Sequence, residues 1–410
     1  MKSSLQLSVI FFALAVLVLG CVSPIVTRDT PSASSQQAEA AMTLQALASQ
    51  SANTPDSVSE TETNLLPQPL YFLAPDNQAI SQIYRLEHDG RTKTQLTFEP
   101  VDVWDYDVSP ADGALAYEAS NQLVLVNADG SSRRVLVEGI PNPDVRSLYN
   151  PTFSPDGQTL AYAHRGLNLY SVSTGVANLV IQDQLNDLGD GQVLPVETYS
   201  PERYSPDGMK LLLALGHWEV APSHAVYYPD TNALVRYEEV EDYIYCCSFH
   251  GGPVWSPDGA SFYGVASAHD YSLKSGELWK VDAATGALTR AFKGADGTVK
   301  LPKELYLAPD GQLYFFLGTY TIDSGFFDTP VLQLVRSAPD GVSDRAVLRQ
   351  ENFVLMNEAL WAPDASFVLV ATAPDRNWNQ GGGVLELYYT DAQGDAVWLA
   401  PFGRELKWGP

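Results

Sequence analysis

The chain has 410 residues, of which 45% are hydrophobic and 18% charged, a composition typical of a globular protein. Asp and Glu number 49 against 24 Lys and Arg, which gives a net charge of −25. Such a charge repels phosphate backbones, so it argues against nucleic-acid binding, and it disfavours a purely electrostatic contact with an anionic bilayer.

Residues 1–20 have the pattern of an export signal. Lys2 supplies a positive charge, and Leu5–Leu19 is almost wholly apolar but too short to span a bilayer comfortably. The run ends in Val18-Leu19-Gly20-Cys21, which resembles a bacterial lipobox. The resemblance implies cleavage before Cys21 and lipid, such as palmitate, on that cysteine; an ordinary signal peptide with an incidental cysteine is the alternative. We therefore expect an extracytoplasmic lipoprotein, anchored to the inner or outer membrane by lipid only.

Residues 21–66 are rich in Ser, Thr, Ala and Gln and poor in aromatic residues. A segment of this composition cannot bury enough apolar surface to form a core. We expect it to be a disordered tether that holds a folded domain, residues 67–410, away from the membrane.

The folded domain contains a repeated turn, roughly every fifty residues. Proline presets φ in this turn, aspartate accepts a bond from the following backbone, and glycine takes a positive φ. Each turn is preceded by an aromatic or aliphatic residue and followed by two or three short apolar runs. The copies are Ser109-Pro110-Ala111-Asp112-Gly113, Ser154-Pro155-Asp156-Gly157, Ser205-Pro206-Asp207-Gly208, Ser256-Pro257-Asp258-Gly259, Ala308-Pro309-Asp310-Gly311 and Ala362-Pro363-Asp364.

Four short strands per repeat indicate the blades of an all-β propeller. The segment Leu70–Phe98 carries only three strand-like runs, and Leu406–Pro410 reads as the missing first strand of that blade. The sequence therefore predicts seven blades, closed by a C-terminal strand that joins the N-terminal blade and removes the free sheet edges. A six-bladed ring with one irregular unit is the alternative.

The run Trp255-Ser256-Pro257-Asp258-Gly259 resembles the WD-like repeats of the TolB and tricorn-protease propeller families, and the resemblance covers residues 67–410. It implies a propeller. Members of these families act as interaction platforms in cell envelopes or as gating domains of peptidases, so the resemblance is poor evidence for one function.

We find no G-x-S-x-G, H-E-x-x-H, Walker or dinucleotide motif, so we expect no enzyme activity and no cofactor. The expected function is a monomeric binding platform for a protein or a cell-wall component. A glycan- or lyase-active propeller and a purely structural scaffold are the alternatives.

The loops opposite the Ser-Pro-Asp-Gly turns carry most of the histidines. We expect these loops to form a binding face, although histidines at loop ends without any ligand are the simpler explanation. A zinc site is less favoured, because no two ligands show a short fixed spacing. The candidates are His164, His217, Trp218, Glu219, Tyr245, Phe249, His250, His269 and Asp270.

Acidic residues recur four positions before the turn, at Asp105, Glu304, Glu358 and, near the C-terminus, Glu405. First strands line a propeller's axis, so these carboxylates predict an acidic ring in the channel. Crowded carboxylates either have raised pKa values or recruit a cation such as Ca²⁺; solvated polar residues in a wet channel are the alternative. The segment 186–197 partly mimics a calcium loop, but Leu188 stands where an oxygen ligand is needed.

Cys246 and Cys247 are adjacent in the predicted binding face. An oxidising compartment favours disulfides, although a bridge between neighbouring residues is strained. A vicinal disulfide and two buried free thiols both remain open.

Overall fold

The computed structural model describes residues 64–139, 147–189, 192–217, 223–237, 252–267, 276–292, 298–321, 331–375, 381–391 and 394–410. The regular elements of these residues are β-strands, and they include no helix that is long and apolar enough to cross a membrane. All of them belong to one compact unit, Glu62–Pro410. The predicted signal, Cys21 and nearly all of the predicted tether lie outside the described residues.

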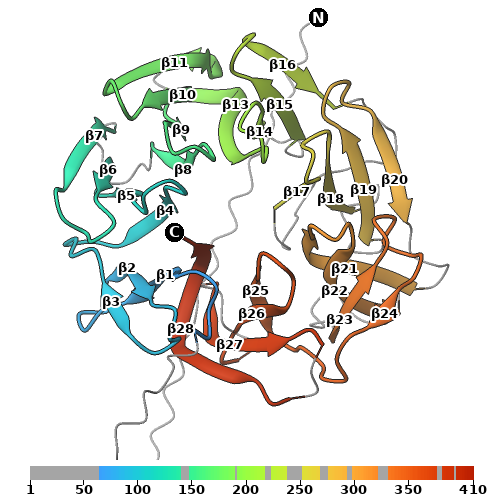
Figure 1. Ribbon diagram of the computed structural model, residues 1–410. Helices are drawn as coiled ribbons and strands as arrows, with labels where there is room; N and C mark the ends of the chain where they lie inside the picture. The colour runs from blue at the N-terminus through green and yellow to red at the C-terminus, as the bar shows by residue number, and fades with distance from the viewer. Residues whose placement is uncertain are drawn as a thin grey trace, which may run out of the picture. The chain divides into compact units, whose positions relative to one another are not determined.

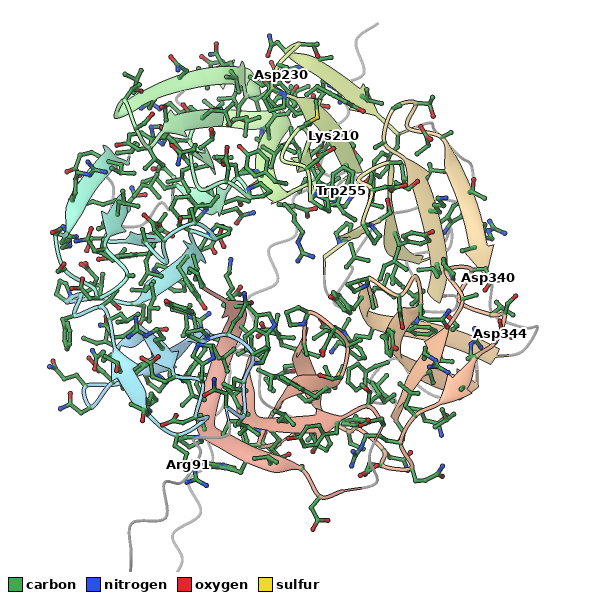
Figure 2. The ribbon with its side chains drawn as sticks, in the orientation of Figure 1. Arg91, Lys210, Asp230, Trp255, Asp340 and Asp344 are labelled. Atoms are coloured by element: carbon green, nitrogen blue, oxygen red, sulfur yellow. The ribbon has the colours of Figure 1, made fainter. Side chains whose placement is uncertain are left out.

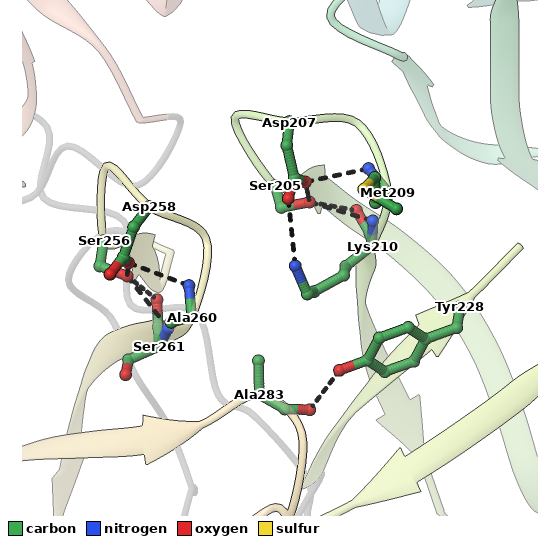
Figure 3. Close-up of polar contacts among 10 residues, drawn as sticks. All are labelled: Ser205, Asp207, Met209, Lys210, Tyr228, Ser256, Asp258, Ala260, Ser261 and Ala283. Carbon is green, nitrogen blue, oxygen red and sulfur yellow. Dashed lines mark hydrogen bonds and ion pairs between the residues drawn. The ribbon is translucent and has the colours of Figure 1, made fainter.

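The Ser-Pro-Asp-Gly turns are held by bonds between their own side chains and backbone. Ser256 Oγ donates to Asp258 Oδ1 at 2.5 Å, and the same oxygen accepts the backbone N–H of Ala260 at 3.0 Å. Gly259 takes a φ of +63°, which disfavours any residue with a Cβ. The turn at Ser205 repeats these contacts (Figure 3). Each turn therefore sets a tight hairpin between the first and second strands of its repeat.

Each hairpin begins an antiparallel sheet, and the sheets are arranged around a central opening (Figure 1). Blade 2 contains β4 (Val103–Val108), β5 (Leu115–Ala119), β6 (Gln122–Val126) and β7 (Arg134–Glu138), and blade 3 contains β8 (Tyr149–Phe153), β9 (Thr159–Ala163), β10 (Gly166–Ser171) and β11 (Val176–Gln182). Blade 4 contains β13 (Gln192–Tyr204), β14 (Leu211–Gly216), β15 (Ser223–Tyr228) and β16 (Ala233–Arg236), with β12 (Gln184–Gly189) beside β13. Blade 5 contains β17 (Val254–Trp255), β18 (Ser261–Ser267), β19 (Gly276–Asp282) and β20 (Leu288–Phe292), and blade 6 contains β21 (Thr298–Leu307), β22 (Leu313–Thr321), β23 (Leu332–Ser337) and β24 (Ala346–Val347).

The last strand joins the two ends of the ring. Blade 7 consists of β25 (Met356–Trp361), β26 (Phe367–Thr372), β27 (Gly383–Tyr389) and the first part of β28 (Val397–Trp408). The second part of β28 pairs with β1 (Leu70–Pro75), which β2 (Ser81–Leu86) and β3 (Lys93–Gln95) follow in blade 1. Two blades thus share one seven-stranded sheet. The predicted seven blades and C-terminal closure are confirmed, and the six-bladed alternative is wrong.

The hydrophobic core lies between neighbouring blades. One cluster, for example, joins Leu73 and Ile83 of blade 1 to Tyr106 and Leu115 of blade 2. The aromatic residue before the turn adds a polar tie, because Trp361 Nε1 donates to the carbonyl oxygen of Glu304 in blade 6 at 2.8 Å. Trp408 and Trp255 make equivalent bonds to the blade before theirs, at 2.7 and 3.3 Å. The repeated aromatic residue therefore holds adjacent blades in register as well as filling the core.

Candidate functional site

The first strands of the seven blades surround a cavity of about 860 Å³. A volume of this order suits a small molecule or a short segment of another chain. Every blade contributes residues to the cavity lining. Examples, from blade 2 round to blade 1, are Asp107, Phe153, Arg203, Val254, Glu304, Glu358 and Lys407.

The predicted acidic residues of this channel bind the backbone of the next blade. Asp105 Oδ2 accepts the N–H of Asn150 at 2.8 Å. Glu358 accepts two N–H groups, those of Glu405 at 2.8 Å and Leu406 at 2.5 Å, and Glu304 accepts the N–H of Ala359. We call each of these carboxylates a clasp, because it joins one first strand to the following one.

The clasps depend on an irregularity of the first strands. The pairing between the first and second strands shifts in register next to Asp105 and next to Glu358. It also shifts in the intervals that contain Asn150 and Glu304. Asn150, Glu304 and Glu405 have φ values of +51°, +52° and +53°. A β-bulge takes backbone groups out of the pairing within its own blade, so an acceptor from the preceding blade can satisfy them.

The channel raises the pKa values of two clasps. Burial raises the pKa of Glu304 to about 7, against the opposing charges of Lys303 and Arg203. Burial and then the charge of Glu405 raise the pKa of Glu358 to about 8, although its two backbone bonds act in the opposite direction. Desolvation therefore outweighs hydrogen bonding at Glu358, as in other enclosed carboxyl groups.

This pKa makes stability depend on pH. The folded state binds the proton of Glu358 more tightly than the unfolded chain, whose carboxyl has the ordinary pKa of 4.5. The free energy of unfolding should therefore fall as pH rises from about 4.5 to about 8.

Removing a neighbouring charge with Glu405→Gln should lower the pKa of Glu358. We expect the free energy of unfolding to rise by about 1 kcal/mol at about pH 8.5, and much less at about pH 5, in urea titrations.

Asp344→Asn is the matched control. Asp344 is exposed, has a left-handed φ of +54° like Glu405, and lies at the outer rim, away from the channel (Figure 2). It should change stability little at either pH. An equal gain from Glu405→Gln at both pH values would refute the pH dependence assigned to Glu358.

The channel also contains cationic side chains, and one of them is available to a ligand. Lys407 Nζ lies 3.2 Å from Asp107 Oδ1. Burial acts to lower the pKa of Lys407, but the negative charges of Asp107, Asp105 and Glu405 outweigh it and raise this pKa. Arg203 lines the same cavity and is exposed. Within the described residues, the guanidinium of Arg203 makes no hydrogen bond or ion pair.

Two candidates of the predicted binding face are described, and both bond to neighbouring backbone. The ring Nδ1 of His164 lies 3.0 Å from the carbonyl oxygen of Ser147, and that of His217 lies 2.9 Å from the carbonyl oxygen of Val196. Nδ1 of each ring must therefore be the protonated donor. His164 ties a loop to the segment just before β8, and His217 ties one to β13 itself, so both bonds have a structural role. The other candidates, Trp218, Glu219, Tyr245, Phe249, His250, His269 and Asp270, and the pair Cys246 and Cys247, lie outside the described residues.

Sequence reasoning missed a pair behind the channel wall. Glu202 lines the cavity, and its Oε2 lies 3.0 Å from Nε2 of the buried His224. The His224 ring stacks on Tyr237 at 5.6 Å. His224 belongs to the apolar strand β15 and Glu202 to β13, so no spacing in the sequence connects them.

The calcium-loop resemblance at residues 186–197 has a different structure. Asn186 and Asp187 lie in β12 and pair with Leu194 and Val193 of β13, so they form a hairpin. Both side-chain oxygens of Glu197 are bound by Arg236, each at 2.6 Å. Across the described ranges, no group of three or more His, Cys, Asp or Glu side chains is arranged to hold a metal ion.

Neither a protein-family model nor a curated protein matches the chain. Among solved structures, it is similar to an oligogalacturonate lyase in complex with manganese, at 13% identity and a TM-score of 0.53, over 81% of this chain and 85% of that one. It is also similar to a prolyl endopeptidase, at 11% identity and a TM-score of 0.51, over 93% of this chain and 56% of that one. TolB from Acinetobacter baumannii is similar over 83% of this chain and 82% of its own, at 14% identity and a TM-score of 0.40. The first two similarities identify the protein as a β-propeller and show its fold alone.

Proposed function

We propose that the protein is a non-catalytic binding propeller of the bacterial cell envelope, which takes part of a protein or a cell-wall component into its channel. The proposal rests mainly on the hydrogen bonds that the channel carboxylates accept. Asp105, Glu304 and Glu358 accept backbone N–H groups of the next blade, so each has a structural role that requires no substrate. The cavity remains open to a ligand, and Arg203 offers it a cation.

The proposal is tested by capture with two matched charge reversals. The full-length protein is extracted in mild detergent, crosslinked within an envelope extract and isolated with its bound material. Arg203→Glu reverses the channel cation, whereas Arg91→Glu reverses an exposed cation at the outer rim (Figure 2). We expect the wild type and Arg91→Glu to capture the same molecule, and Arg203→Glu to lose it.

The enzymatic alternative is tested on the same preparation. Purified protein is incubated with polygalacturonate, with and without manganese, and with envelope polysaccharides, and the chain length of the products is measured. We expect no cleavage. Turnover that Arg203→Glu abolishes would replace the binding proposal with the glycan- or lyase-active alternative.

The proposed location depends on the lipid on Cys21. In a bacterial host fed labelled palmitate, the wild type should carry the label and migrate as the processed form. Cys21→Ser should lose the label and keep its signal, because the acylated cysteine is the site at which processing occurs. Ser23→Ala, beside the processing site, should behave as the wild type. Processing of Cys21→Ser to the normal size would support the ordinary signal peptide instead.

A further inference from the structure

Among the strands that the structure describes, β11 is a sheet edge without the usual protections. It is the outermost strand of blade 3 (Figure 1), and its seven residues, Val-Ala-Asn-Leu-Val-Ile-Gln, include no charge and no proline. Val176 and Leu179 are 51% and 50% exposed. An outer strand of this kind presents unpaired N–H and C=O groups together with apolar side chains, which is the surface that other β-strands bind.

The outer strands of the other blades carry the usual protections. Some include a charged residue, and others are too short to pair or run into a proline, features that discourage edge-to-edge pairing. These strands are β3 with Lys93, β7 with Arg134 and Glu138, β16 with Arg236, β20 with Arg290, the two-residue β24, and the first part of β28, which reaches Pro401. The absence of such protection in blade 3 therefore distinguishes one edge of the ring.

We propose that β11 pairs with β11 of a second copy of this chain, in antiparallel orientation, to form a two-fold dimer. Two proteins of net charge −25 repel each other, so a facing surface that is free of charge makes their association less costly. The continuous stretch Gly166–Gln182, which forms β10 and β11, contains no Asp, Glu, Lys, Arg or His. A second copy supplies the same neutral edge, whereas a basic partner would find no carboxylate in this stretch to bind.

The geometry of β11 suits this pairing. Val176–Leu179 pair regularly with β10, and the single register shift comes after Leu179, so four consecutive residues form a regular edge. Antiparallel pairing of one strand with its own copy is a two-fold arrangement, which closes at two copies and leaves neither edge free. The proposal replaces the monomer expected from the sequence, and it does not depend on what the channel binds.

Cysteine crosslinking tests the dimer in the full-length protein. Leu179→Cys places a thiol in the proposed interface, and Val347→Cys places one on an outer strand of blade 6 at a similar exposure of 46%. A short bismaleimide is applied to intact membranes and to the purified protein in detergent. We expect Leu179→Cys to give a covalent dimer several-fold above Val347→Cys and the wild type, which controls for the native cysteines.

Charges placed on the same edge provide the specificity control. Val176→Lys with Asn178→Lys, added to Leu179→Cys, should reduce the dimer to the level of Val347→Cys, because like charges then face each other across the pairing. Both positions are exposed, so the thermal unfolding temperature should be unchanged. The proposal is overturned if Leu179→Cys crosslinks no more than Val347→Cys in both preparations, or if the lysines leave the crosslink intact in a folded protein.

Discussion

Removal of Arg404–Pro410 should abolish cooperative folding of the propeller. These residues form the first strand of blade 1 and pair with Leu70, Tyr71 and Leu73. The deletion removes the buried Leu406, a type of side chain that contributes about 1.5–3 kcal/mol when fully buried, and the half-buried indole of Trp408 with its hydrogen bond to blade 7. It also exposes the edge of β1 and opens the ring. We expect the truncated protein to lose its near-ultraviolet circular dichroism and its sharp thermal transition.

Deletion of Pro410 alone is the control, because this exposed residue lies beyond the end of β28. It should unfold at nearly the wild-type temperature. Trp408→Ala should be intermediate, since it removes the Nε1 bond to the carbonyl oxygen of Trp361 but leaves the strand in place. A cooperative transition at the wild-type temperature after loss of Arg404–Pro410 would show that the ring does not need its C-terminal strand.

Arg349→Met should cost about 3 kcal/mol or more of the free energy of unfolding. Arg349 is only 1% exposed and follows the outer strand of blade 6. Its guanidinium donates to the carbonyl oxygens of Tyr389 at 2.8 Å and Gly394 at 2.5 Å in blade 7, and it lies over the ring of Tyr388. Methionine fills part of the space but leaves both carbonyl groups without their donor. Urea unfolding followed by tryptophan fluorescence measures the loss.

Glu351→Gln separates the ion pair from these carbonyl bonds. Glu351 pairs with Arg349, but its side chain is 43% exposed, so solvent screens the interaction. We expect this change to cost less than about 1 kcal/mol. If the two substitutions cost the same, the contribution of Arg349 would come from the ion pair, and the bonds between blades 6 and 7 would be unimportant.

The turn chemistry made the architecture predictable. A Pro-Asp-Gly sequence determines its conformation through contacts within a few residues, so each copy marks a hairpin wherever it occurs. The spacing of the copies then gave the number of blades, and the resemblance of Trp408-Gly409-Pro410 to Trp255-Ser256-Pro257 identified the closing strand.

The roles of the polar residues were not predictable in the same way. The acidic residues before the turns were predicted to form a ring in the channel, and the structure places Asp105, Glu304 and Glu358 as clasps between blades. This role depends on a β-bulge and on the rotation between neighbouring blades, neither of which has a signature in the sequence. The contact of Glu202 with His224 was missed for a similar reason, because it joins two strands through the core.

Amide hydrogen exchange at the C-terminal strand is the most direct test of the central claim, that the channel carboxylates join neighbouring blades. Glu358→Ala removes the acceptor of the Glu405 and Leu406 N–H groups, whereas Glu138→Ala changes an exposed carboxylate of blade 2. The peptide that contains Glu405 and Leu406 should exchange faster in Glu358→Ala and at the wild-type rate in Glu138→Ala. Equal exchange in all three proteins would contradict this claim, because the carboxylate of Glu358 would then not hold the N–H groups of Glu405 and Leu406.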